Sequence, residues 1–161
     1  KDYYQAIQSF AGASKRLELI GQGKTTSIYK DFAHSPSKLK ATTSAVKDQF
    51  ENRSLIACME LHTFSSLDQQ FINEYKGSMN TADFAVVYFN PKTLEHKKLP
   101  SLHEDQVKVA FDRADLLVFT ESEKLIDWLK GQTWANKNLL LMSSGNFGGL
   151  VLEDLANQLV G

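Results

Sequence analysis

Short apolar runs alternate with helical patterns along most of this 161-residue chain, and this alternation limits its possible folds more than any other feature. A strand followed by a helix and another strand pairs in parallel, because the helix carries the chain back along the sheet. The sequence therefore predicts a single α/β domain with a Rossmann-like, mostly parallel sheet and helices on both faces. The buried strands are expected at Leu55–Leu61, Ala82–Phe89, Leu116–Phe119 and Leu139–Met142.

Apolar residues that recur every three or four positions predict the helices that follow the strands. These positions are Leu39, Thr43, Val46 and Phe50; Phe71, Ile72 and Tyr75; Val107, Ala110 and Phe111 within 103–114; Leu125, Trp128 and Leu129; and Leu152, Leu155 and Leu159. Capping signals favour helix starts at Ser35, which precedes Pro36, and at Ser66 and Thr120. Asn90 and Pro91 end a strand and could begin a helical turn.

A short helix and a β-hairpin are expected before the parallel sheet. Tyr3, Ile7 and Phe10 share one face of the helix. Two extended runs follow, with the turn predicted at Gly21–Lys24 between them. The chain starts with Lys1 and not with Met, so we expect it to be cut from a longer protein.

The sequence Gly-Gln-Gly-Lys-Thr at Gly21–Thr25 resembles part of a nucleotide-binding P-loop. That motif needs a glycine with four residues between it and the Gly-Lys pair, and Glu18 stands there. A P-loop also leads into a helix, whereas the residues after Thr25 are β-branched and aromatic. We therefore predict that Gly21–Lys24 forms a hairpin turn and not a P-loop.

Charge and composition exclude several classes of function. The 18 basic and 19 acidic residues give a net charge of −1, which argues against a nucleic-acid binder. No apolar run is long enough for a membrane span. Cys58 is the single cysteine, so a reducing, cytoplasmic location is expected, with this side chain in the core. The scattered histidines predict no metal site.

Ligands of such sheets bind beyond the carboxyl ends of the strands. Asp31 and His34 stand at one strand-to-helix junction, where they could meet an anion or merely satisfy local backbone groups. Ser143–Gly149 is a polar, Gly-rich loop at another junction, although its glycines lack dinucleotide-binding spacing. Glu60 and His62 follow a third strand. No Gly-x-Ser-x-Gly element is present to support a serine hydrolase.

Three segments together resemble the C-terminal domain of the Mur ligases, the ATP-dependent amide ligases of bacterial peptidoglycan assembly. Lys15–Glu18 is similar to the Arg-x-Glu element of the family, and Tyr29–Pro36 is similar to its Asp-(Tyr/Phe)-Ala-His-x-Pro signature. Met142–Gly149 looks most like the branch that attaches the tripeptide L-alanyl-γ-D-glutamyl-meso-diaminopimelate to UDP-N-acetylmuramate. The L-alanine-adding branch remains an alternative, and so does a non-catalytic Rossmann-like ligand-binding module.

The resemblance implies roles for individual residues. Arg16 would lie near the nucleotide, Asp31 would accept from the ribose hydroxyls, and His34 would orient the nucleotide or the amine. The residues expected to meet the incoming amino acid or peptide are His62, Asn90, Lys92, Ser143, Ser144, Asn146 and Phe147. One departure is that Ser65 and Ser66 stand where the family often has an arginine.

The resemblance also implies what surrounds this domain. Residues 1–161 would form one substrate-presenting domain, and the central ATPase and N-terminal UDP-sugar domains would lie outside this chain. ATP, Mg²⁺, UDP-N-acetylmuramate and an amine substrate would be needed by the full-length ligase, which works through an acyl phosphate. The domain alone is expected to be inactive.

Overall fold

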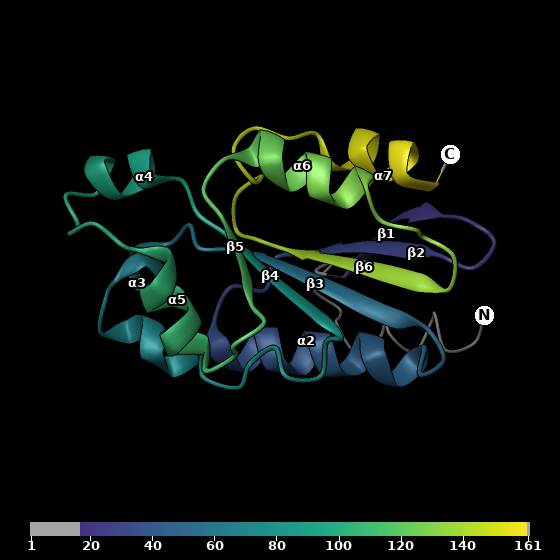
Figure 1. Cartoon of the computed structure of the whole chain (residues 1–161), viewed down its shortest axis with the longest axis horizontal. Coiled ribbons are helices and arrows are strands. Elements are labelled where there is room, and N and C mark those ends of the chain that lie inside the picture. Colours follow the sequence, from purple (N-terminus) through teal and green to yellow (C-terminus); the bar gives the residue numbers. More distant parts are fainter. Residues whose placement is uncertain (1–16, 161) are drawn as a thin grey trace.

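The computed structural model describes residues 17–160, and it shows one six-stranded sheet (Figure 1). The strands are β1 (Glu18–Gln22), β2 (Ser27–Asp31), β3 (Ser54–Glu60), β4 (Phe84–Tyr88), β5 (Leu117–Phe119) and β6 (Lys137–Met142). Their order is β1-β2-β6-β3-β4-β5, and every neighbouring pair is parallel except β1 with β2. The predicted mostly parallel sheet is confirmed. The helix expected at Tyr3–Phe10 lies outside the described residues.

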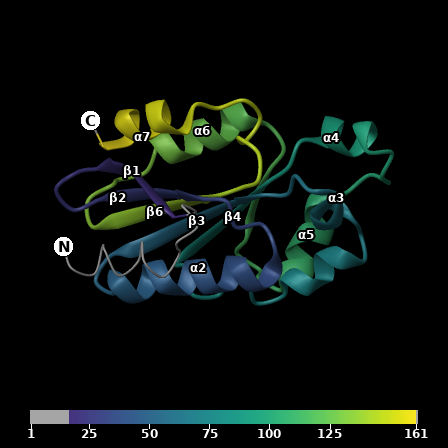
Figure 2. The same ribbon diagram turned by 180° about the vertical axis from the view of Figure 1, so that it is seen from behind.

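Helices cover both faces of this sheet, as Figures 1 and 2 show from opposite sides. They are α2 (Pro36–Gln49), α3 (Phe64–Leu67), the 3₁₀ helix η1 (Phe71–Tyr75), α4 (Pro91–His96), α5 (Glu104–Phe111), α6 (Ser122–Lys130) and α7 (Leu152–Val160). One face carries α2, η1 and α5, and the other carries α6 and α7. Between residues 17 and 160, no helix has both the length and the apolar character to cross a bilayer.

The central strand β3 separates two apolar cores. Leu55, Ala57 and Met59 point into the core beneath α2, whereas Ile56 and Cys58 point into the core beneath α6 and α7. This alternation follows from the two-residue period of a strand, and it needs apolar residues at every position because both faces are covered. Burial raises the pKa of the Cys58 thiol. The cysteine is therefore a core residue, as predicted.

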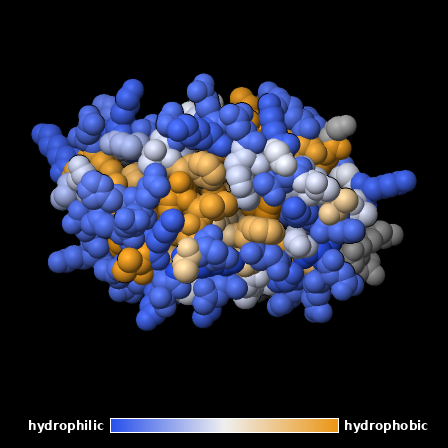
Figure 3. Space-filling view, viewed as in Figure 1, coloured by the Kyte–Doolittle hydropathy of each residue, from blue (hydrophilic) through white to orange (hydrophobic). Residues whose placement is uncertain are grey.

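The edge strand β5 is less enclosed than β3. All three of its side chains, Leu117, Val118 and Phe119, are half-buried. The space-filling view shows apolar side chains gathered near the middle of this face, in the region where β5 runs in Figure 1 (Figure 3).

The predicted hairpin is confirmed, but its turn lies two residues later than expected. β1 continues to Gln22, which pairs with Ser27, and the Gly23 N–H donates to the Thr26 carbonyl at 2.8 Å. The register of the ladder shifts between Leu19 and Gly21. The glycine at position 21 therefore belongs to an irregular strand and not to the turn.

Two predicted helix caps are wrong. Ser66 lies inside α3, whose cap is Thr63, with Oγ1 accepting from the Ser66 N–H at 3.1 Å. The helix expected after Ser66 is η1, and its N-cap is Gln70. The N-cap of α6 is Glu121 and not Thr120. Serine and threonine satisfy many local backbone geometries besides the cap, so spacing alone misplaces the boundary.

Other helix boundaries agree better with the sequence. Ser35 is the N-cap of α2 and Pro36 its first residue, as predicted, although the serine side chain makes no capping bond. The predicted turn at Pro91 is α4. The helix expected over 103–114 is shorter, because Asp112 takes a left-handed conformation (φ 53°) and ends α5.

Gly21 provides a test of the packing between β1 and α7. A Cβ at this position would lie 2.9 Å from the Ala156 Cβ, which is closer than carbon atoms tolerate. We predict that Gly21→Ala lowers the free energy of unfolding by about 1–3 kcal/mol. Gly23→Ala is the matched control, because its Cβ would meet Val160 at an ordinary 3.6 Å. Equal stability of the two variants in urea unfolding would contradict this packing.

Candidate functional site

The carboxyl ends of β2, β6 and β3 lie side by side, and they bring three predicted loops together. Met142 at the end of β6 pairs with Asp31 on one side and Met59 on the other. The next residue, Ser143, therefore sits between Asp31 and Glu60. Its N–H donates to the Asp31 carbonyl at 3.0 Å, and its Oγ donates to Glu60 Oε1 at 2.6 Å.

Glu60 anchors the Gly-rich loop after β6. Its carboxylate is buried, and the same Oε1 also accepts from the Phe147 N–H at 2.8 Å. The Ser143 hydroxyl oxygen in turn accepts from the Gly145 N–H at 2.7 Å. A carboxylate that accepts two hydrogen bonds from one loop defines the path of its backbone.

The second half of this loop has an unusual backbone. Phe147, Gly148 and Gly149 all have positive φ, at 56°, 81° and 96°. A Cβ at Gly148 would also lie 2.6 Å from the Tyr88 hydroxyl oxygen, so glycine is required there. The Phe147 side chain is fully buried, with its ring 6.2 Å from that of Tyr88. The ring holds the loop to the sheet.

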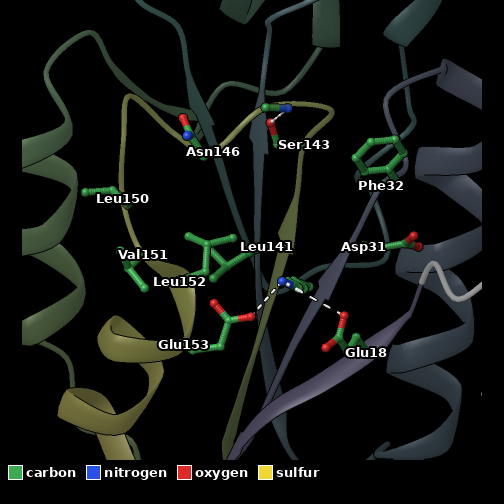
Figure 4. A pocket seen from close by; sticks show the side chains of 12 residues that line it. Glu18, Asp31, Phe32, Leu141, Ser143, Asn146, Leu150, Val151, Leu152 and Glu153 are labelled. Carbon is green, nitrogen blue, oxygen red and sulfur yellow. Dashed lines mark hydrogen bonds and ion pairs between the residues drawn. The ribbon is translucent and has the colours of Figure 1, made fainter.

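A pocket of about 660 Å³ opens beside this loop (Figure 4). It is lined by Glu18, Lys30, Asp31, Phe32, Leu141, Ser143, Gly145, Asn146, Leu150, Val151, Leu152 and Glu153. In Figure 4 the apolar Leu150 and Val151 lie on one side and Phe32 on the other, with Ser143 and Asn146 between them. The pocket thus combines apolar walls with a few converging polar groups, as small-molecule sites do.

An ion pair lies in this pocket. Lys30 Nζ is 2.7 Å from Glu153 Oε2 and 3.9 Å from Glu18 Oε1. The hydrogen bond that Lys30 donates to Glu153 raises the pKa of Lys30 and lowers the pKa of Glu153. Lys30 and Glu153 are therefore charged at neutral pH, and a carboxylate of the chain itself neutralises the lysine.

His34 lies next to the pocket but is not part of its lining. Its Nδ1 is 3.0 Å from the Phe32 carbonyl oxygen, which matches the local backbone role considered from the sequence. Its own carbonyl accepts a hydrogen bond from the Tyr75 hydroxyl. Burial raises the pKa of Tyr75, so the phenol keeps the proton that it donates. Tyr75 thereby fixes the turn that carries His34.

The remaining predicted site residues lie in different places. His62 follows β3, with 44% of its side chain exposed, and its Nδ1 lies 3.7 Å from Glu60 Oε2. Asn90 caps α4 by accepting from the Lys92 N–H at 2.9 Å, and both residues are outside the pocket lining. The buried Ser144 hydroxyl has no hydrogen-bond partner among residues 17–160. Arg16 lies outside the described residues.

Sequence reasoning missed the anchoring role of Glu60, which it named only for following a strand, and that of Tyr75. Glu60 is an acid at the end of a buried apolar run, and such a position needs compensating partners. That signal could have marked it. Tyr75 gave no signal beyond its place on a predicted helix face, because its partner is 41 residues away.

Residues 15–145 match the family described as "Mur ligase, glutamate ligase domain". The chain belongs to this family. The fold and the resemblance of the Tyr29–Pro36 segment agree with that membership.

Two curated relatives represent different branches of the Mur ligases. The UDP-N-acetylmuramate--L-alanyl-gamma-D-glutamyl-meso-2,6-diaminoheptandioate ligase of Haemophilus influenzae is 26% identical over 151 residues, which are 93% of this chain and 32% of that protein. The UDP-N-acetylmuramate--L-alanine ligase of Caldicellulosiruptor bescii is 39% identical over 83 residues, 52% of this chain and 18% of that protein. The chain spans a third or less of these relatives.

Solved structures share this fold. The murein peptide ligase of Psychrobacter arcticus has a TM-score of 0.65 at 22% identity, over 96% of this chain and 31% of that chain. The second structure is a domain of a Haemophilus ducreyi protein that is described as a UDP-N-acetylmuramate:L-alanyl-gamma-D-glutamyl-diaminopimelate ligase. It has a TM-score of 0.62 at 23% identity, over 89% of this chain and 99% of that chain. The second chain therefore has the same fold over nearly its whole length.

The anchoring role of Glu60 can be tested by amide hydrogen exchange. Glu60→Ala removes the acceptor of Ser143 and Phe147, so the loop should open more often and the Phe147 amide should exchange at least about tenfold faster. Glu60→Gln is the control, because an amide oxygen can still accept both hydrogen bonds. Unchanged protection of Phe147 in Glu60→Ala would show that the carboxylate does not hold the loop.

Proposed function

We propose that this chain is the C-terminal domain of an ATP-dependent amide ligase that joins a peptide to UDP-N-acetylmuramate. The incoming amine substrate is proposed to be L-alanyl-γ-D-glutamyl-meso-diaminopimelate, as in peptidoglycan recycling. The central ATPase domain and the UDP-sugar domain belong to the rest of the protein. A cytoplasmic location follows from this proposal, because the reaction consumes ATP.

One observation carries the proposal. The Asp31 turn, which bears the family signature, and the Ser143–Gly149 loop, which looks like that of the tripeptide-adding branch, are joined by the hydrogen bond from Ser143 N–H to the Asp31 carbonyl. Asp31, Ser143 and Asn146 line the same pocket. A nucleotide and an amine substrate could therefore be presented from a single edge. The H. influenzae relative, which aligns with 93% of this chain, supports the choice of branch.

The proposed roles follow the positions of the residues. Asp31 is assigned to the nucleotide ribose, and His34 follows it at the same strand end. Arg16 is assigned to the nucleotide from the family resemblance alone. The hydroxyl and amide groups of Ser143, Ser144 and Asn146 meet the peptide, and Phe147 holds their loop in place. His62 lies at the same edge of the sheet. Asn90 and Lys92 would reach the far end of a long peptide, because α4 projects away from the body in Figure 1.

In the proposed reaction the domain positions the substrates more than it takes part in breaking bonds. ATP phosphorylates the muramoyl carboxylate, and the amine then displaces phosphate from the acyl phosphate. Phosphoryl transfer depends on alignment and charge neutralisation, which a domain closing over the nucleotide supplies. Among residues 17–160, no cluster of three His, Cys, Asp or Glu side chains could hold a metal ion. We assign magnesium to the central domain because the family resemblance implies it.

L-alanine is the alternative amine, since the C. bescii L-alanine ligase is 39% identical over half of this chain. Assays of the full-length protein should give a kcat/KM for the tripeptide that exceeds that for L-alanine by at least about 100-fold, because buried polar groups built for the longer substrate are left unpaired by the shorter one. Phosphate release is the measurement. Equal or faster turnover with L-alanine would reverse the choice of substrate.

The affinity of the isolated domain for ATP distinguishes a non-catalytic binding module from a ligase domain. The ligase proposal predicts that calorimetry on residues 1–161 detects little or no ATP binding, because most phosphate contacts would come from the central domain. Tight ATP binding by the isolated domain would favour a self-sufficient module. The gene upstream of Lys1 should also encode a Gly-x-x-Gly-Lys-(Ser/Thr) element, and a full-length gene without one would contradict the ligase proposal.

A further inference from the structure

We propose that His62 is the proton acceptor for the incoming amine, and that Glu60 is the positioning residue that orients its imidazole. This inference rests on the proposed ligase function and deepens it. The loop hydrogen bonds use only Oε1 of the Glu60 carboxylate, and the inference concerns the second oxygen, Oε2.

The two oxygens of Glu60 have different tasks. Oε1 accepts from both Ser143 Oγ and the Phe147 N–H, and these two bonds are sufficient to anchor the loop. Oε2 faces Nδ1 of His62 at 3.7 Å. An amide would serve Oε1 equally well, so the loop alone does not explain a charged group in a position where burial opposes charge.

In a proton-accepting pair the base must be open to the substrate, and the carboxylate that orients it can be buried. Glu60 and His62 differ in exposure in this way. The Glu60 side chain is 4% exposed, whereas that of His62 is 44% exposed. When Nδ1–H points to the carboxylate, Nε2 is the acceptor of the neutral imidazole. The buried carboxylate then stabilises the positive charge that the imidazole gains. Hydrogen bonds of this kind are often long before substrate binds.

The pair lies against the proposed peptide loop. A Cβ at Gly145 would come within 3.1 Å of both Glu60 Oε1 and His62 Cδ2, so the bare glycine backbone passes directly beside them. Ser143, Gly145 and Asn146 line the pocket, and Glu60 and His62 adjoin this lining at Gly145. We place the amine of a peptide held by this loop beside His62.

Other titratable groups at this edge do not replace the imidazole. The phenol of Tyr88 comes from β4, and its pKa is raised by burial and by the Glu60 charge, so it holds its proton at neutral pH. Asp31 comes from β2 and is buried beside Ser143. His62 is the exposed base on the β3 side of the loop.

The proposed step is balanced without a further reagent. The amine arrives as an ammonium group and has no lone pair, and His62 Nε2 takes one proton from it. The freed lone pair forms the C–N bond with the acyl-phosphate carbon, and the C–O bond to phosphate breaks with its electron pair on the leaving oxygen. The second proton of the nitrogen leaves with the departing phosphate.

The test uses the full-length ligase with two nucleophiles. Hydroxylamine is mostly unprotonated at neutral pH and traps the acyl phosphate as a hydroxamate without a proton acceptor, whereas the tripeptide requires one. We expect His62→Gln to lower kcat for tripeptide ligation by about 100-fold or more. Hydroxamate formation should stay within about twofold. His96→Gln, an exposed histidine at the end of α4, is the control and should behave like the parent protein.

The pH dependence gives a second readout that a purely structural role would not change. Below the amine pKa, ligation by His62→Gln should rise about tenfold per pH unit, in step with the free amine. The rate of the parent protein should level off at a lower pH. Glu60→Gln keeps the loop bonds and should lower kcat by about tenfold without raising the KM for the tripeptide.

Three results would overturn the proposal. Unchanged tripeptide ligation in His62→Gln would show that no proton passes through this residue. Equal losses with tripeptide and hydroxylamine would show that the substitution damages the site as a whole. If the parent protein forms no hydroxamate from ATP and UDP-N-acetylmuramate, the ligase function itself fails, and this outcome is distinct from the other two.

Discussion

The buried carboxylate of Glu60 is the interaction on which this edge of the molecule depends. It ends the central strand β3 and accepts hydrogen bonds from Ser143 and Phe147 of the loop after the neighbouring strand β6. Ser143 then bonds to the backbone of Asp31 at the end of β2. Three segments far apart in the sequence are thus joined through the Glu60 carboxylate and through the hydroxyl and N–H of Ser143. If these bonds are lost, the sheet can remain intact while the pocket loses its shape.

The rest of the fold makes such a carboxylate tolerable. β3 lies between two apolar cores, so a charge at its middle would be prohibitively unfavourable, but at its last residue the chain supplies donors from the adjacent loop. Glycines at 145 and 148 allow the loop backbone to approach Glu60, His62 and Tyr88. The positive φ angles after Asn146 and the buried Phe147 ring then return the chain to α7. Burial of this kind costs stability and gives a defined conformation in return.

Much of the sheet could be predicted from the sequence, because buried parallel strands read as apolar runs. Leu55–Leu61 and Leu139–Met142 are examples, and the parallel arrangement told us which loops would meet. Helix caps at Ser66 and Thr120 were mispredicted, since the outcome depends on which nearby hydroxyl or acid fits the local backbone. The partners of Glu60 and Tyr75 lie tens of residues away, so no local pattern could reveal them. Asn90 and Lys92 were predicted from the resemblance alone, and whether they meet a substrate stays a prediction.

The most direct measurement is a crystal structure of the full-length protein with a non-hydrolysable ATP analogue, UDP-N-acetylmuramate and the tripeptide. We expect the peptide to lie over the carboxyl ends of β6 and β3, held by Ser143 and Asn146, with its amine within hydrogen-bond distance of His62 Nε2. The Glu60 bonds to Ser143 and Phe147 should persist. A peptide bound at the opposite edge of the sheet, or a Ser143–Gly149 loop detached from Glu60 when substrate is bound, would contradict this expectation.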